Sequence, residues 1–115
     1  MKRWLAAFRN SFAGLRHGFK REAPVREEIL AFLFSLPVAP FVANSVWHLL
    51  LLWGVLLFIL IVELLNTAIE ALADEVSLEK RDNIRIAKDC GSAAVLLATI
   101  IAVAVWGVSL WQLVF

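Results

Sequence analysis

The amino-acid sequence predicts an all-α integral membrane protein that forms a single membrane domain over residues 1–115. We expect an amino-terminal amphipathic surface helix followed by three transmembrane helices. Hydrophobic residues make up 62% of the chain, and the mean hydropathy of +0.82 is typical of membrane proteins. The charges are also segregated. Every Asp, Glu, Lys and Arg lies in residues 2–28 or 63–89, so that 29–62 and 90–115 are uncharged.

Residues 1–21 are expected to form a helix that lies in the membrane interface. On a helical wheel, Trp4, Phe8, Phe12 and other large apolar side chains gather on one face, and the Lys and Arg side chains gather on the other. This distribution is typical of interfacial helices, and a soluble helix packed on a core is the less favoured alternative. The helix should end at Ala23-Pro24, because proline disfavours the α conformation in the residue before it.

Three apolar stretches follow, and we expect them to cross the membrane at about 25–43, 46–72 and 91–115. The first contains Pro37 and Pro40, which a transmembrane helix tolerates when neighbouring helices satisfy the freed carbonyl groups. Asn44-Ser45 forms a tight turn, and His48 should anchor or hydrogen-bond the start of the second span. The third span repeats a small residue every four positions, which favours close helix packing: Ala94, Ala98 and Ala102.

Residues 75–89 are expected to form a charged cytoplasmic loop between the second and third spans. Seven Lys and Arg lie in residues 1–28 and four in 75–89, whereas the turn at 38–47 has none. The positive-inside rule therefore puts the amino terminus and this loop in the cytoplasm. Both charged segments then meet the acidic end of the second span on one side of the membrane.

The acidic end of the second span carries a polar stripe. Glu63, Asn66, Thr67, Glu70 and Asp74 share a face about 100° wide on a helix. Counting about 20 residues from the start of the span places Glu63 in the interface and Glu70 in water. An acidic residue at the membrane boundary indicates function, and oxygen ligands of this kind suit Mg²⁺.

The remaining sequence features narrow the possible chemistry. A net charge of +1 gives no reason to expect a nucleic-acid partner, and the single Cys90 cannot form a disulfide within the chain. Neither a zinc-type Cys/His spacing nor a Gly-x-x-x-x-Gly-Lys-Ser/Thr loop is present. The residues alone thus indicate an acidic, metal-competent site at headgroup depth. For the charges at 74–85, a solvated helix end stays open as an alternative.

Two motifs resemble the signature of the small prokaryotic diacylglycerol kinases. They are Glu63-x-x-Asn66-Thr67-Ala68-Ile69-Glu70-x-x-x-Asp74 and Ala87-Lys88-Asp89-x-Gly91-Ser92-Ala93-Ala94-Val95-Leu96. The similarity extends to Ser11-x-x-Gly14-Leu15-Arg16 and to Glu22 with Arg26-x-Glu28. The resemblance implies a homotrimer with active sites between subunits, multi-pass in the bacterial cytoplasmic (inner) membrane. It also implies that diacylglycerol is phosphorylated directly from Mg·ATP to give phosphatidic acid.

The resemblance also implies roles for individual residues. Glu63 would be the general base, Asn66 would orient the site, and Glu22 and Glu70 would hold Mg²⁺. The nucleotide would contact Arg3, Asn10, Glu22, Glu70, Glu79, Lys80, Arg81, Lys88 and Asp89. The lipid would border Arg3, Arg16, Glu28, Glu63 and Ser92. Asn10 and Arg81 depart from the family pattern, and both concern nucleotide contact.

Three alternatives stay open at the level of the sequence. An undecaprenol kinase of the same superfamily would share the fold and the site but differ in the lipid pocket. A small proton-coupled exporter should have four spans and an acidic residue near mid-bilayer, whereas the sequence indicates three spans with its acids at one interface. A non-enzymatic assembly subunit would leave the polar stripe without a role.

Overall fold

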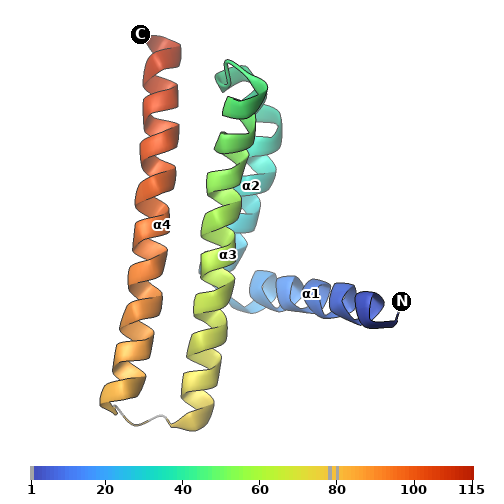
Figure 1. Cartoon of the computed structure of the whole chain (residues 1–115), viewed down its shortest axis with the longest axis vertical. Coiled ribbons are helices and arrows are strands. Elements are labelled where there is room, and N and C mark those ends of the chain that lie inside the picture. The colour runs from blue at the N-terminus through green and yellow to red at the C-terminus, as the bar shows by residue number, and fades with distance from the viewer. Residues whose placement is uncertain (1, 78, 80) are drawn as a thin grey trace.

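The computed structural model describes residues 2–77, 79 and 81–115. Four helices account for almost all of them: α1 (Lys2–Arg21), α2 (Ala23–Val42), α3 (Val46–Val76) and α4 (Asp82–Val114) (Figure 1). No strand occurs among the described residues, so the all-α class predicted from the sequence is confirmed.

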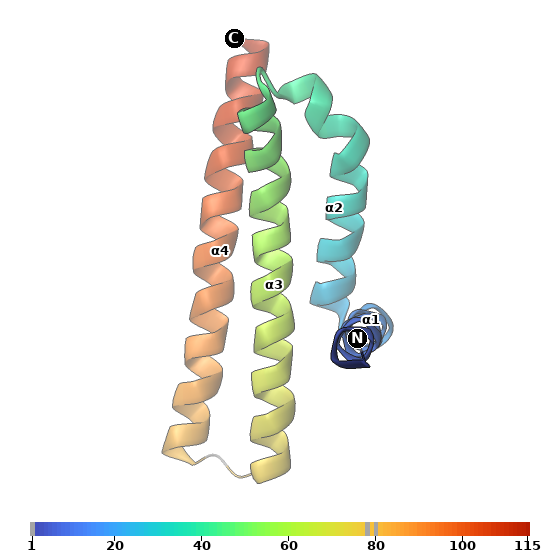
Figure 2. The same cartoon turned by 45° about the vertical axis from the view of Figure 1, so that its right-hand side comes forward.

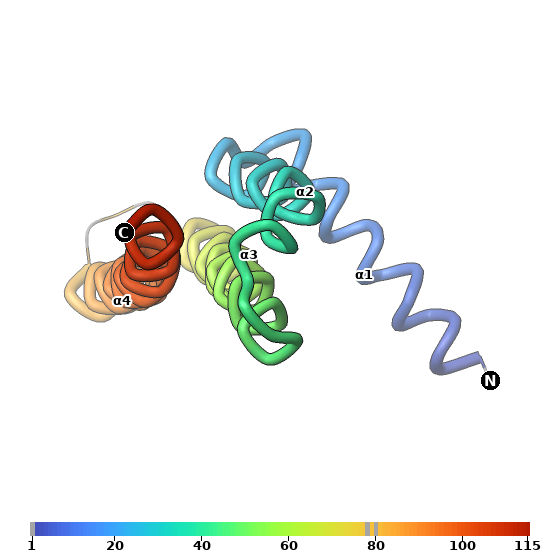
Figure 3. The backbone as a smooth tube through the Cα atoms, turned by 90° about the horizontal axis from the view of Figure 1, so that it is seen from above, coloured from blue at the N-terminus to red at the C-terminus, as the bar shows by residue number. Residues whose placement is uncertain are grey.

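The two longest helices, α3 and α4, run antiparallel along their whole length, and α2 packs beside α3 (Figures 1 and 2). Seen from above, α3 lies between α2 and α4 (Figure 3). The helix α1 crosses this bundle at a steep angle and extends away from it toward the amino terminus (Figures 1 and 3). It meets the bundle well short of the end where α3 and α4 are joined (Figure 1). Both long helices therefore extend beyond the level of α1.

The helix breaks at a single residue one position before the predicted Ala23-Pro24, and Ala23 itself is already helical. Glu22 has extended backbone angles and separates α1 from α2. Pro24 lies in the first turn of α2, where its missing N–H leaves no helical hydrogen bond unmade. Arg26 Nη1 donates to the carbonyl oxygen of Phe19 at 3.1 Å, which braces the last turn of α1 against α2.

The two prolines of α2 lie inside the helix and do not end it. Pro37 and Pro40 are both helical, and the axis of α2 bends over its last turns (Figure 2). Between the carbonyl groups that the prolines leave without a helical donor, those of Leu33 and Leu36, the carbonyl oxygen of Ser35 accepts from Trp53 Nε1 of α3 at 3.1 Å, which ties this part of α2 to α3.

Small residues hold α3 and α4 close together. Ala98 and Ala102 are buried against α3, as the predicted small-residue face requires, whereas Ala94 is exposed. Farther along, Trp106 Nε1 of α4 donates to the carbonyl oxygen of Leu52 of α3 at 3.0 Å. The buried cluster between the two helices comprises Val55, Ile59, Ala98 and Ala102.

At the end of the bundle where α2 turns into α3, His48 has the hydrogen-bonding role predicted for it. Its Nδ1 accepts from the backbone N–H of Asn44 at 3.0 Å, so the neutral ring carries its hydrogen on Nε2. Nε2 donates to Ser109 Oγ of α4 at 2.8 Å, and that hydroxyl donates to the carbonyl oxygen of Val105 at 2.7 Å. His48 thus connects the turn between α2 and α3 to the carboxyl-terminal part of α4.

The predicted charged loop at 75–89 is wrong in its extent. α3 continues to Val76 and α4 begins at Asp82, so only residues 77–81 connect them. The apolar stretches end before the helices do, and charged side chains occupy the extra turns. Arg85 pairs with Asp89 along α4 at 3.4 Å, and Lys88 of α4 pairs with Asp74 of α3 at 2.7 Å.

Within the described residues, α3 and α4 are long and apolar enough to cross a membrane. α2 does not meet the same criterion of length and hydropathy, because its first turns carry three charged residues that shorten its uncharged stretch: Arg26, Glu27 and Glu28. A crossing by α2 therefore stays a prediction. The aromatic side chains of α1 that were assigned to the membrane interface are exposed, with Trp4, Phe8 and Phe12 63–71% accessible.

The corner between α1 and α2 generates a prediction about Gly18, which is buried there. A Cβ atom at this position would lie 2.5 Å from Val25 Cγ1 and 3.5 Å from Leu64 Cδ2. Gly18→Ala should therefore lower the free energy of unfolding by about 1–3 kcal/mol through overpacking. Gly14→Ala is the matched control in the same helix, because nothing lies within 4 Å of a Cβ there. Thermal unfolding in detergent measures both variants, and equal midpoints would contradict the prediction.

Candidate functional site

The polar stripe of α3 runs from a buried acid to exposed ones. Glu63 is 8% accessible, Asn66 is half-buried, and Glu70 and Asp74 are exposed. Leu64, next to Glu63, lies against the Gly18 position of α1. The stripe therefore begins at the level of α1 and continues toward the connection between α3 and α4.

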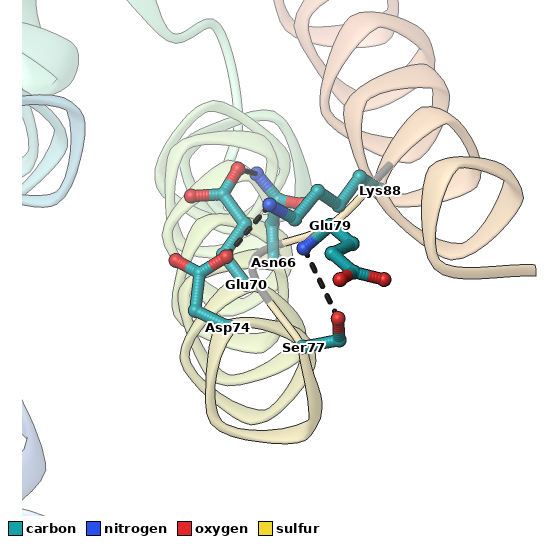
Figure 4. Close-up of polar contacts among 6 residues, drawn as sticks. All are labelled: Asn66, Glu70, Asp74, Ser77, Glu79 and Lys88. Carbon is teal, nitrogen blue, oxygen red and sulfur yellow. Dashed lines mark hydrogen bonds and ion pairs between the residues drawn. The ribbon is translucent and has the colours of Figure 1, made fainter. Parts of the chain in front are cut away.

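Asn66 links the stripe to α4 on one edge. Its Nδ2 donates to Glu70 Oε1 at 3.2 Å, one helical turn farther on (Figure 4). Its Oδ1 is buried without a hydrogen-bond partner among the described residues and faces Gly91 of α4. The bond to Glu70 occupies one carboxylate oxygen and leaves the other free to accept from or coordinate a ligand.

Lys88 belongs to α4 and reaches across to α3. Its Nζ lies 2.7 Å from Asp74 Oδ1 (Figure 4). Both side chains are about half exposed, so the pair adds little to stability. The ion pair instead fixes the position of the Lys88 ammonium group beside the acidic stripe. Lys88 was predicted as a loop residue, but it is a helical residue fixed by an ion pair.

Thr67 lies on the opposite edge of the stripe and faces α1. It lines a groove of about 500 Å³ between α1 and α3. The other lining residues are mostly small or apolar: Ser11, Gly14, Leu15, His17, Gly18, Leu64, Ala68 and Ala71. The stripe predicted from the sequence thus divides, with Asn66 turned toward α4 and Thr67 toward α1.

Four carboxylates from two helices gather around the buried end of the stripe. Burial is the main electrostatic cost for the Glu63 and Glu28 carboxylates, and repulsion adds to it, from Glu70 and Glu27 on Glu63 and from Glu63 and Glu27 on Glu28. A bound cation or proton would lower this repulsion. Sequence reasoning included Glu28 but missed Glu27, because only the packing of α2 on α3 brings this position near Glu63.

Glu22 and Glu70 are the residues predicted to hold Mg²⁺. Glu22 is half-buried at the joint between α1 and α2, and its side chain makes no capping hydrogen bond to α2. The described residues contain no group of three His, Cys, Asp or Glu that could form a metal cage. Each of the two residues offers carboxylate oxygens, the ligands that Mg²⁺ prefers, and Mg²⁺ commonly joins one or two carboxylates to phosphate oxygens and keeps several waters.

The residues of α1 that were predicted to contact the nucleotide or the lipid are spread along the helix. Arg16 lines a second, largely apolar groove of about 510 Å³, which α1 forms with α2 and α3. Arg3 is the second residue of α1, whose amino-terminal part extends away from the bundle (Figure 3). Asn10 directly precedes Ser11, which lines the groove between α1 and α3.

The remaining predicted residues lie at and after the α3–α4 connection. Glu79 donates its backbone N–H to Ser77 Oγ at 3.0 Å (Figure 4), and its carboxylate is 3.9 Å from Arg81. Asp89 pairs with Arg85, and Ser92 is exposed on α4. Lys80, predicted to contact the nucleotide, lies outside the described residues.

Comparison with known proteins identifies the family. The model of the family described as prokaryotic diacylglycerol kinase matches residues 9–110. The diacylglycerol kinase of Escherichia coli K12 is 41% identical over 103 residues, which cover 89% of this chain and 84% of that protein. The diacylglycerol kinase of Pseudomonas aeruginosa is 42% identical over 106 residues, with coverages of 92% and 86%. The chain therefore belongs to the prokaryotic diacylglycerol kinase family.

Proposed function

We propose that the enzyme transfers the γ-phosphoryl group of Mg·ATP directly to the free hydroxyl of diacylglycerol, which gives phosphatidic acid. Membership of a kinase family argues against the exporter and assembly-subunit alternatives. The observation that carries the proposal is the arrangement of the stripe on α3. A buried carboxylate, Glu63, lies at the level of the surface helix, and exposed polar groups continue from it toward water.

The helix α1 supplies a depth marker for this reaction. Its exposed aromatic face, with Trp4 and Phe8, suits the headgroup region of a membrane. Leu64, the residue beside Glu63, packs against α1 at Gly18. A lipid hydroxyl at the glycerol level would then lie at the depth of Glu63. Glu70 lies about 10 Å farther along the helix axis, on the side where the phosphates of a nucleotide would arrive.

The residues of the site divide the work of phosphoryl transfer. Glu63 accepts the proton of the lipid hydroxyl while that oxygen forms its bond to the γ-phosphorus and the bond to the leaving phosphate breaks. Glu22 and Glu70 would hold Mg²⁺, which when bound neutralises phosphate charge. Asn66 orients Glu70 through its amide, and Lys88 presents its ammonium group to phosphate oxygens.

We further propose a homotrimer in which active sites lie between subunits. The amino-terminal part of α1, which carries Arg3, extends away from its own bundle, so this residue would reach the stripe of a neighbouring copy. Large apolar side chains are exposed along α4, including Leu96, Ile100 and Val103. Such a surface requires either lipid or another helix to cover it.

The proposed setting is the bacterial cytoplasmic membrane, with the amino terminus and the α3–α4 connection inside the cell. All eleven Lys and Arg residues lie in the segments that this orientation places on the cytoplasmic side. Three crossings, by α2, α3 and α4, give the multi-pass arrangement that brings α1 and the charged ends of α3 and α4 together.

An acceptor assay with purified protein tests the proposed reaction. In mixed micelles with radiolabelled Mg·ATP, diacylglycerol should be phosphorylated in preference to undecaprenol. Glu63→Gln should lower turnover by about 10²–10⁴-fold, the usual contribution of a general base. Preferential labelling of undecaprenol would replace the proposed lipid, and near-normal turnover by folded Glu63→Gln would remove Glu63 from its role as base.

Substitution of Glu70 tests the proposed metal ligand. In Glu70→Gln the side-chain oxygen can still accept from Asn66 Nδ2, so the fold should be retained. The concentration of Mg²⁺ that gives half-maximal activity should rise by about tenfold or more, because one charged ligand is lost. Glu75→Gln is the control, an exposed acid on α3 outside the stripe. Equal Mg²⁺ dependence of the two variants would exclude Glu70 as a ligand.

A further inference from the structure

Gly91 lies in the interior of α4, where the backbone conformation does not require glycine. Glycine is unfavourable within helices, and none of the glycines among the described residues has a positive φ. The reason for glycine here is the space around it. A Cβ atom on Gly91 would overlap Asn66 Oδ1 and would lie 3.3 Å from Asn66 Cγ.

The same helix shows that this crowding is specific to one site. Gly107, also in α4, has nothing within 4 Å of the position that a Cβ would occupy. Gly91 is buried, and it lines a small crevice between α3 and α4 together with Asn66 and Ala94. The close approach of Gly91 therefore concerns the polar stripe itself.

Rotation of the Asn66 amide would not make room for a side chain at position 91. A half-turn about the last side-chain bond would put Nδ2 where Oδ1 now lies, so the overlap would remain. It would also turn Oδ1 toward the carboxylate of Glu70, an unfavourable pairing of two acceptors. The amide could leave only by a rotation about either side-chain torsion that moves Oδ1 and Nδ2 together, which would break the 3.2 Å hydrogen bond to Glu70.

Among the described residues, α4 donates no hydrogen bond that would hold the Asn66 amide in place. Asn66 Oδ1 has no hydrogen-bond donor among the described residues, although it is buried. The hydrogen that glycine carries in place of Cβ points toward this oxygen, which allows a weak C–H···O contact. The orientation of Asn66 thus depends on the absence of a side chain opposite it.

We propose that Gly91 is a positioning residue for phosphoryl transfer. By leaving the space opposite Asn66 empty, it keeps the Asn66 amide in the orientation that donates to Glu70 Oε1. Glu70 is thereby held with its other carboxylate oxygen free for the nucleotide-bound metal ion. This inference rests on the proposed function, in which Glu70 is a metal ligand.

Gly91→Ala tests the inference, with Gly107→Ala as a control in the same helix. Turnover of Gly91→Ala should fall by up to about 100-fold, the loss that follows when a positioned group is displaced by about 1 Å. Its half-maximal Mg²⁺ concentration should rise several-fold, and Mg·ATP should shift its thermal unfolding midpoint less than that of the unsubstituted protein. Gly107→Ala should stay within about twofold of the unsubstituted protein in all three measurements.

Asn66→Ala separates positioning from simple packing. Asn66 Cβ lies 3.9 Å from the Cβ position of residue 91, an ordinary contact, so alanine at 91 fits once the amide is removed. Asn66→Ala alone should reproduce the weaker Mg·ATP thermal shift, and adding Gly91→Ala should cause no further loss. A second loss of equal size would overturn the inference. So would a Gly91→Ala protein whose Mg²⁺ dependence is normal and whose midpoint alone is lower. An unsubstituted protein without Mg²⁺-dependent activity would instead contradict the proposed function.

Discussion

The cost of burying a carboxylate where the apolar part of α3 ends governs the rest of the structure. Glu63 is almost fully buried, and the charges of Glu27 and Glu70 repel it. A side chain in this position is stable only when other groups compensate for its lost hydration. The surrounding elements make such compensation possible. α1 lies at the same level, because Leu64 packs on Gly18, and the stripe beyond Glu63 leads from the buried acid to exposed side chains.

The second requirement is one antiparallel register between α3 and α4. Three contacts lie along the same pairing of the two helices: His48 with Ser109, the Leu52 carbonyl with Trp106, and Asn66 with Gly91. The ion pair of Lys88 with Asp74 lies past the apolar part of the helices, and the long lysine side chain reaches more than one helical turn from that pairing to make it. Because the first three contacts use the same register, sliding one helix against the other would break all three together. The hydrogen bonds at one end of the bundle thus help to fix the polar groups at the other.

Much of this arrangement could be predicted from the sequence, because it depends on local patterns. Helical periodicity identified the amphipathic α1, and spacing placed Glu63, Asn66 and Glu70 on one stripe. Contacts between helices were out of reach for sequence reasoning. The nearness of Glu27 to Glu63, the ion pair of Lys88 and the crowding of Asn66 by Gly91 all depend on the relative rotation and register of two helices. Hydropathy also failed at the charged ends of α3 and α4, since a loss of apolar residues does not show whether a helix ends.

That continuation has a functional consequence. If residues 75–89 formed a loop, Lys88 and Asp89 would be carried by a flexible segment, and ordering it around a nucleotide would cost conformational entropy. Instead, α3 runs to Val76, α4 begins at Asp82, and only residues 77–81 connect them. Glu70, Asp74 and Lys88 are therefore presented by rigid helices that extend past the level of α1. Phosphoryl transfer depends mainly on positioning and charge stabilisation, so rigid helices that project into water are a suitable support for it.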